Sequence, residues 1–332
     1  MANHRPSPLR RACLAVVAVV LTAPLVGQTA HGQTYPMRPI TFIVPVQAGT
    51  ASDLVARVLA DKVSAKLGQQ IIIENIVGAG GAIGAARVAK AEPTGYVIGL
   101  FNFGIHAILP HLPTPLPFDP WRDFVPITML VDVPSVLIAI PKLPAKTLPE
   151  LVALAKQSPG KLNYASVGRG SPQHLAMEHL KAETGTELTH VAYRGGAQAT
   201  TAISTGEVDV FWIASSVAVP FIQAGTVRAL AIGETKRAKF MPDLPTVAEQ
   251  GYPDYAYEGW FGLFTAAGTP NAAREILRRE FTAALAMPDV IERLAVLGMI
   301  PHPTTEDEAT AMIRKKDAVM GPLIRRLGLD KQ

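Results

Sequence analysis

The sequence predicts an α/β fold of two lobes, each with a sheet of mostly parallel strands covered by helices. After Tyr35, short apolar runs alternate with segments whose apolar residues recur at helical spacing, which is typical of such sheets. The 332 residues exceed what one hydrophobic core usually supports, which favours two lobes. A strand, a glycine-containing loop and a helix start follow one another in both halves of the chain.

The first 32 residues have the layout of a secretory signal peptide. Arginines precede an apolar run over 12–26, and Ala30-His31-Gly32 offers small residues at the positions that a signal peptidase reads. The apolar run is shorter than the roughly 20 residues of a membrane span, and no later stretch is long enough. We therefore expect cleavage after Gly32, a periplasmic location and no membrane insertion of the mature chain.

The composition after residue 32 excludes several classes of site. The only cysteine, Cys13, lies inside the predicted signal peptide, so the mature chain has no disulfide, thiolate metal site or cysteine nucleophile. Removing residues 1–32 takes away three arginines and no acidic residue, which lowers the basic residues from 31 to 28 against 27 acidic ones. This balance provides no basic patch for nucleic acid.

The elements of the first lobe are predicted from residue 35 onward. Strands are expected at 41–44, 71–74 and 96–101, and helices at 52–67 and 84–89. Gly68 has the position of a C-cap glycine at the end of the first helix. The proline-rich stretch 110–126 indicates an extended surface connection. Strands at 127–130 and 135–140 follow, and we expect the chain to pass to the second lobe there.

The second lobe repeats this alternation. Helices are predicted at 149–155, 172–184 and 198–205. Strands are predicted at 162–165, 189–191, 208–213 and 227–232. A strand at 258–265 is expected to return the chain to the first lobe, and 270–327 is largely helical. We therefore predict a first lobe of 33–136 and 258–332 and a second lobe of 137–257.

Two loops have the local chemistry of an anion site. The stretch 41–57 predicts a strand, a tight glycine loop and a helix that begins at Ser52 or Asp53, whose first amides lack intrahelical partners. Such amides bind carboxylate or phosphate without a cationic side chain. The alternative is a plain turn in which Ser52 caps the helix. A second glycine loop leads to a helix start at Ser171-Pro172, a serine N-cap followed by proline.

Motifs for cofactors and catalysis are missing or wrongly spaced. Gly78, Gly80 and Gly84 follow a strand and open a helix, but they leave three residues where a dinucleotide fingerprint needs two. The chain has no Gly-Lys-Ser or Gly-Lys-Thr and no Gly-x-Ser-x-Gly elbow. His174 and His179 are five residues apart, which places them on different sides of a helix. We therefore predict no cofactor, no metal and no catalytic residue.

Aromatic residues and one arginine are predicted at strand ends, where open α/β sheets bind ligands. The aromatic residues are Tyr164, Tyr193, Trp212 and Trp260, and for each of them a place in the core is the alternative. Arg194 lies beside two glycines. It is able to pair with a ligand carboxylate or to form a structural ion pair.

Short motifs along nearly all of the mature chain resemble one family. In chain order they are Tyr35-Pro36-Met37-Arg38-Pro39-Ile40, Val44-Pro45 through Asp53 to Ala56-Arg57, Glu74-Asn75, Gly78-Ala79-Gly80-Gly81 with Gly84, Pro93-Thr94-Gly95-Tyr96, Asn163-Tyr164-Ala165-Ser166, Gly168, Gly170-Ser171, His174-Leu175, Tyr193-Arg194-Gly195, Val208-Asp209 and Leu244-Pro245-Thr246-Val247-Ala248-Glu249. Each motif is weak alone, and together they are specific. The chain resembles the substrate-binding proteins of tripartite tricarboxylate transporters, the Bug family of bacterial periplasmic receptors.

The resemblance implies a type II periplasmic-binding-protein fold, with two α/β lobes joined by crossing strands and a ligand cleft between them. It implies a monomeric receptor that captures a small organic carboxylate, largely by main-chain amides, and delivers it to the membrane subunits of a tripartite carrier. Carried over to this sequence and joined with the residues above, the predicted ligand-binding residues are Ala48, Gly49, Thr50, Ser52, Asn102, Ser166, Gly168, Gly170, Ser171, His174, Tyr193, Arg194 and Trp212.

The sequence departs from the family pattern at three places. Thr50 stands where a second glycine is usual, Val46-Gln47 replaces an aromatic-proline pair, and 211–213 replaces a further acidic residue. An aromatic wall from Trp212 predicts a larger or flatter ligand.

Two other functions stay open at this point. One is a periplasmic hydrolase or isomerase on the same frame, for which the chain offers only His174 with Ser166 or Ser171. The other is a module that senses a ligand for a membrane kinase.

Overall fold

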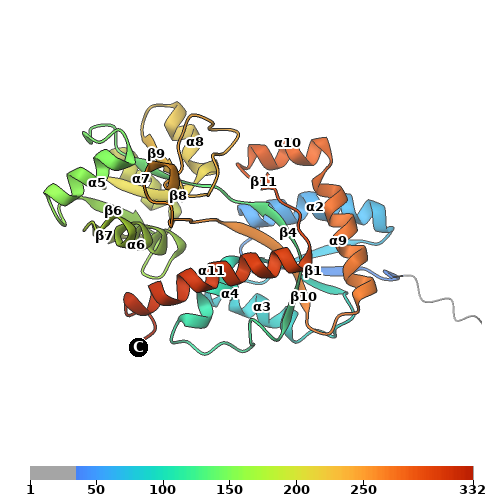
Figure 1. Cartoon of the computed structure of the whole chain (residues 1–332). Coiled ribbons are helices and arrows are strands. Elements are labelled where there is room, and N and C mark those ends of the chain that lie inside the picture. Colours follow the sequence, from blue (N-terminus) through green and yellow to red (C-terminus); the bar gives the residue numbers. More distant parts are fainter. Residues whose placement is uncertain (1–34, 332) are drawn as a thin grey trace, which may run out of the picture. The chain divides into compact units, whose positions relative to one another are not determined.

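Two mixed sheets organise the described chain, and each defines one lobe (Figure 1). The first sheet has the order β11-β4-β10-β3-β1-β2. Its strands are β1 (Ile40–Val44), β2 (Ile71–Asn75), β3 (Val97–Asn102), β4 (Phe124–Asp132), β10 (Trp260–Ala266) and β11 (Ile300–Pro301). The second sheet has the order β7-β6-β8-β5-β9. Its strands are β5 (Ser135–Ala139), β6 (Asn163–Ser166), β7 (Thr189–Ala192), β8 (Val210–Ala214) and β9 (Arg228–Ile232).

The computed structural model describes residues 35–331. The predicted signal peptide, residues 1–32, lies outside the described residues. The predicted lobe limits, at 136/137 and 257/258, remain a prediction, and from here on the two lobes are named by their sheets.

The prediction of mostly parallel sheets is wrong. β1 pairs in parallel with β2 and β3, and β6 pairs in parallel with β7 and β8. β10 is antiparallel to both β3 and β4, and β5 is antiparallel to both β8 and β9. Parallel neighbours need a crossover connection, usually a helix. β5 and β10 instead enter their sheets directly from the other lobe, so they run against their neighbours.

Helices flank both sheets. Those that follow strands of the first sheet are α2 (Ala51–Leu67), α3 (Ala82–Ala89), α4 (Phe103–Ala107), α9 (Asn271–Leu285), α10 (Pro288–Val296) and α11 (Glu306–Arg326), with the short 3-10 helices η1 (Ala79–Gly81) and η2 (Leu109–His111). Those of the second lobe are α5 (Leu148–Gln157), α6 (Pro172–Thr184), α7 (Gly196–Thr205) and α8 (Ser215–Gln223), with η3 (Ala248–Gln250) in the returning segment.

Two predicted helix ends are confirmed. Gly68 ends α2 in the left-handed conformation, with φ of 65°. Ser171 is the N-cap of α6, its side chain accepts a hydrogen bond from the amide of His174, and Pro172 is the first helical residue. The sequence did not predict α4 and α8, because α4 has only five residues and α8 is apolar over 217–222 and contains Pro220.

The two lobes are joined where the crossing segments touch. The chain passes from β4 to β5 without an intervening helix and returns through 233–259. The amide of Val133 donates to the carbonyl of Gly259 (2.8 Å), and the amide of Gly233 donates to the carbonyl of Ser135 (3.0 Å). These backbone hydrogen bonds hold the crossing segments against each other.

Aromatic side chains continue the contact between the lobes. The rings of Trp260, Phe103, Tyr257 and Trp212 follow one another, with centroids 5.7–6.4 Å apart and T-shaped pairing. α11 packs on α4 and β4 of the first lobe and on α6 of the second. The junction between the lobes is therefore a packed aromatic core and not only a pair of linkers.

The first prediction concerns Gly259. A Cβ atom there would lie 2.7 Å from the carbonyl oxygen of Val133, so Gly259→Ala has to push the crossing segments apart. Because overpacking of this kind usually costs about 1–3 kcal/mol, we expect a loss of that size in the free energy of unfolding, measured by chemical denaturation. Gly196→Ala is the matched control, since a Cβ there meets nothing within 4 Å at the start of α7. Equal stability of the two variants would contradict the prediction.

Candidate functional site

A cavity of about 600 Å³ lies between the start of α3 and the loop before α6. Its wall takes Ala79, Gly80, Ala82 and Ile83 from the turn into α3, Asn102 and Gly104 from the end of β3, Ile108, Leu109, Leu112, Thr114, Pro115, Leu116 and Pro117 from the following segment, and Arg169, Gly170, Ser171 and Pro172 from the second lobe. We call it the larger cavity. Most of its wall is apolar, and its polar groups come mainly from the two helix starts.

The start of α6 brings positive potential to this cavity. The helix has 13 residues, and its first amides lack intrahelical partners, so its N-terminus carries a partial positive charge. Pro172 has no N–H, and Ser171 already caps the amide of His174 at 3.3 Å. Arg169 adds a full positive charge from the same loop, and its Nη2 donates to the carbonyl of Leu327 (3.2 Å).

The turn into α3 forms the opposite wall. Ala79 has φ of 47°, a left-handed conformation that residues with a side chain rarely adopt. Gly84 leaves no room for a side chain, because an added Cβ atom would lie 2.8 Å from Pro45 Cβ, and a Cβ atom on Gly81 would lie 3.4 Å from the same atom. Pro45 thus packs against this turn and holds the start of α3 at the cavity.

A second cavity of about 140 Å³ shares Asn102 and Pro172 with the first. The rest of its wall comes from both lobes and is Phe103, Val133, Ser135, Gln173, Trp212, Ile213, Ala214, Tyr257, Gly259, Trp260 and Phe261. We call it the smaller cavity. Asn102 caps α4, because its Oδ1 accepts from the amide of Gly104 (2.8 Å).

The first predicted loop lies outside both cavities. Ala48 and Gly49 are exposed, Thr50 is the N-cap of α2, and Ser52 is buried, so the expected side-chain cap by Ser52 is absent. The amide of Gly49 donates to Asp53 Oδ2 at 2.8 Å. One amide that the sequence assigned to a ligand carboxylate is therefore occupied by a carboxylate of the protein itself.

Asp53 is the centre of this arrangement. Its side chain is 1% exposed and also accepts from Arg57 Nε and Asn75 Nδ2, both at 2.9 Å. Desolvation raises the pKa of Asp53, but the hydrogen bonds from Arg57, Gly49 and Asn75 outweigh it and hold the pKa below its ordinary value. The start of α2 is thus occupied by a carboxylate of the same helix, that of Asp53.

The second predicted loop lies partly at the larger cavity and partly behind it. Gly170 and Ser171 line the cavity, whereas Ser166, Gly168 and His174 do not. The amide of Gly168 donates to Ser166 Oγ (3.0 Å), and the amide of Gly170 donates to His174 Nδ1 (3.3 Å). These amides are satisfied within the loop.

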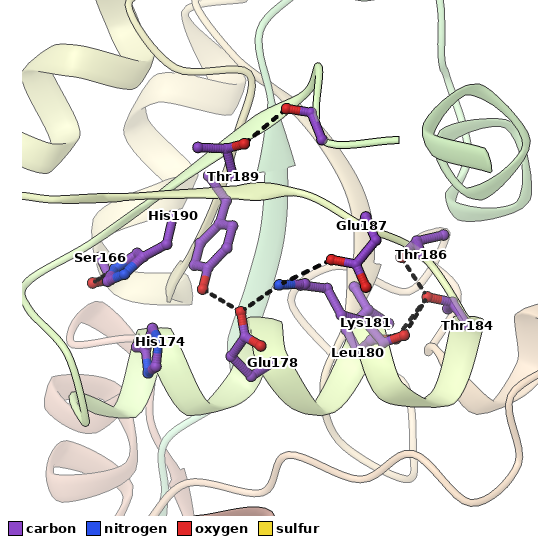
Figure 2. Close-up of polar contacts among 12 residues, drawn as sticks. Ser166, His174, Glu178, Leu180, Lys181, Thr184, Thr186, Glu187, Thr189 and His190 are labelled. Atoms are coloured by element: carbon purple, nitrogen blue, oxygen red, sulfur yellow. Dashed lines mark hydrogen bonds and ion pairs between the residues drawn. The ribbon is translucent and has the colours of Figure 1, made fainter. Parts of the chain in front are cut away.

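Behind the loop, polar side chains form a cluster of their own (Figure 2). Ser166 Oγ lies 2.6 Å from His190 Nε2, and the His190 ring lies 4.4 Å from that of His174. Glu178 accepts from Tyr164 and from Lys181, at 2.6 and 2.7 Å. Burial, with a smaller effect of His190, lowers the pKa of His174 to about 4, so this imidazole is neutral near pH 7. The cluster supports the loop from inside the lobe.

The remaining predicted residues are dispersed. Tyr193 donates to Glu207 (2.8 Å), and Arg194 is exposed at the start of α7, so neither lines the larger or the smaller cavity. Trp212 is 1% exposed, lines the smaller cavity and donates from Nε1 to Ser135 Oγ (2.8 Å). Tyr164 is buried, as the core alternative held, whereas Trp260 is 2% exposed and lines the smaller cavity.

The sequence reasoning missed three parts of the larger cavity, which are 79–83, 108–117 and Arg169. The glycines at 78–84 were compared with the dinucleotide fingerprint and counted among the family motifs, but they were not considered as a ligand site, although they open a helix. The prolines of 110–126 indicated only a connection. Arg169 lies between two glycines of the second predicted loop. Arg194 also adjoins glycines, so the sequence offered the same reason to select either arginine.

Two features are absent from residues 35–331. No helix in that range is long and apolar enough to cross a membrane. Within the same range, no three His, Cys, Asp or Glu side chains are grouped to hold a metal ion.

The second prediction concerns Asp53→Asn. The variant loses the charge that pairs with Arg57, and we expect a loss of about 1–3 kcal/mol in the free energy of unfolding at pH 7. Because the pKa of folded Asp53 lies below the ordinary value of about 3.9, its contribution is complete above that pH and is lost as the pH falls through the folded pKa. The difference from the unmodified protein should therefore shrink toward pH 3.

Chemical denaturation at pH 7 and pH 3 measures this difference. Asp61→Asn is the matched control, an exposed carboxylate on the same helix, and it should change stability little at either pH. A loss for Asp53→Asn that is independent of pH would contradict a role for its charge.

Known proteins are similar to this chain in sequence and in fold. The model of the tripartite tricarboxylate transporter family receptor matches residues 55–329. A UPF0065 protein of Bordetella pertussis is 36% identical over 328 residues, which cover 98% of this chain and 99% of that protein.

Two solved structures show the same two-lobed architecture. The structure of R. palustris Rpa4515 with adipate has 30% identity and a TM-score of 0.76, and the match covers 89% of this chain and 98% of that one. The structure of MatC from Rhodopseudomonas palustris with bound malate has 31% identity and a TM-score of 0.72, with 87% and 100% covered. This chain therefore belongs to the family of tripartite tricarboxylate transporter receptors.

Proposed function

We propose that this chain is a periplasmic receptor that binds a small organic carboxylate in the larger cavity. The observation that carries the proposal is the pair of helix starts, of α3 and α6, whose residues line one cavity of about 600 Å³. Unpaired amides at helix starts attract anions, and the guanidinium of Arg169 at the same wall reinforces them. The apolar remainder of the wall suits the carbon skeleton of an organic acid.

The relatives support the chemical class of the ligand. Rpa4515 was solved with adipate and MatC with malate, and both ligands are carboxylates. The fold of this chain matches theirs over most of its length. We therefore expect a carboxylate at the helix starts of this protein as well.

Binding without chemical change fits the side chains better than hydrolysis or isomerisation. Ser166 is fully buried, and its hydroxyl is already engaged by His190 and the amide of Gly168. The hydroxyl of Ser171 accepts from the amide of His174, whose ring accepts from Gly170. A nucleophile needs an open path to its substrate and a base within reach. The ligand should therefore be recovered unchanged after incubation with the protein.

The export signal and the partner belong to the same proposal. Residues 1–32 serve as the signal peptide, and the mature monomer delivers its ligand to the membrane subunits of a tripartite carrier. Co-purification of those subunits with the liganded protein tests delivery. Capture of a membrane kinase in their place would favour the sensing alternative.

The third prediction separates two arginines. Thermal unfolding against mono-, di- and tricarboxylates should show a raised midpoint for one class, because ligand at 100 times its dissociation constant adds about 2.7 kcal/mol. Arg169→Gln should weaken that ligand about tenfold, which corresponds to roughly 1.4 kcal/mol, since the cation at the cavity wall is lost.

Arg194→Gln is the matched control, because Arg194 was an equal candidate in the sequence but is exposed and lines neither cavity. Its affinity should equal that of the unmodified protein. If Arg194→Gln weakened the ligand and Arg169→Gln did not, the carboxylate would instead lie at the start of α7. Absence of a shift with every carboxylate would refute the proposed function.

A further inference from the structure

We propose that the smaller cavity binds the ring of an aromatic monocarboxylic acid whose carboxylate group lies in the larger cavity. The inference rests on the proposed function and narrows its ligand class. The two cavities share Asn102 and Pro172, so one molecule can extend from the helix starts into the smaller cavity.

The size of the smaller cavity fits one ring. Its volume is about 140 Å³, and an apolar protein cavity of about 150 Å³ holds one benzene molecule. The space inside the smaller cavity therefore suits one ring.

The wall of the smaller cavity favours an aromatic ring over an alkyl chain. Five of its side chains are aromatic, namely Phe103, Trp212, Tyr257, Trp260 and Phe261. Phe103, Tyr257 and their neighbours already meet in T-shaped pairs. Edge-to-face contacts add about 0.5–1.5 kcal/mol per pair beyond the burial of apolar area.

The charges around the two cavities set the orientation of the ligand. No charged side chain lines the smaller cavity in the described part of the chain. A carboxylate placed there would lose its hydration without a counter-ion, which is costly. Lys316 lies behind the wall, with Nζ 5.4 and 5.0 Å from the ring centroids of Phe103 and Tyr257, and is not part of the lining. The acid group therefore points to Arg169, and the ring points inward.

Titration calorimetry of the purified protein with propanoate, benzoate and terephthalate tests the inference. Benzoate should bind at least tenfold more tightly than propanoate. Terephthalate should bind more weakly than benzoate, and tighter binding would overturn the monocarboxylate assignment and point to Lys316.

A variant that fills the smaller cavity provides a second test of the inference. Ala214 lines the smaller cavity, and Ala214→Leu should weaken benzoate at least tenfold while propanoate stays within twofold. Ala214 ends β8 and directly precedes α8. Ala224→Leu, at the exposed C-terminal end of α8, is the matched control and should change neither affinity. Equal unfolding midpoints of the two variants without ligand establish that both are folded.

The outcomes separate the two proposals. If propanoate or another aliphatic acid binds and benzoate has no advantage, the receptor function stands and the ring subsite is wrong. If Ala214→Leu weakens both acids equally, or neither, the ring does not occupy the smaller cavity. If no carboxylate binds, the proposed function itself fails.

Discussion

The hydrogen bonds between the two crossing segments are the constraint on which both cavities depend. The amide of Val133 binds the carbonyl of Gly259, and Gly233 joins Ser135 to Tyr257 through its amide and its carbonyl. Four of these five residues, all but Gly233, also line the smaller cavity. Because the backbone contacts that join the lobes form this wall, any change in the angle between the lobes alters the shape of the cavity.

Close approach at this junction leaves no space for adjustment by side chains. A Cβ atom on Gly233 would lie 2.8 Å from both Ser135 Oγ and the Trp212 ring. The Trp212 indole is fixed in turn by its hydrogen bond to Ser135. A buried lysine, Lys316, completes the packing, and the faces of two aromatic rings offset part of the cost of its desolvation. Burial still lowers its pKa to about 8.

The sequence predicted local structure well and strand direction poorly, for a physical reason. Gly68 and Ser171-Pro172 end and begin helices through contacts within a few residues, and such contacts are visible in the sequence. The direction of β5 and β10 depends on where the preceding connection enters the sheet, and no residue of the strand itself encodes that. The alternation of apolar runs is the same for parallel and antiparallel neighbours when both faces are covered.

The same limit applies to the candidate site. The sequence identified helix starts with free amides but not Asp53 as the internal acceptor for Gly49, because that bond depends on the final turn geometry. Arg169 and Arg194 follow strand ends and adjoin glycines, so they are equivalent in the sequence. Only the packing of the second lobe on the segment 108–117 brings Arg169, and not Arg194, to a cavity wall.

The boundary between the two cavities explains how one receptor can recognise an acid group and a carbon skeleton separately. Pro172 opens α6 without an N–H, so its ring adds apolar surface where the two cavities meet. The amides of Ser171 and His174 are already paired, with the carbonyl of Gly168 and with Ser171 Oγ. Asn102, on the other lobe, uses Oδ1 to cap α4, which leaves its Nδ2 as the donor available to a ligand. In the proposed binding mode, polar recognition at the helix starts and apolar recognition at the crossing segments therefore use different walls, so a change of skeleton specificity would require no change in the residues proposed to hold the carboxylate.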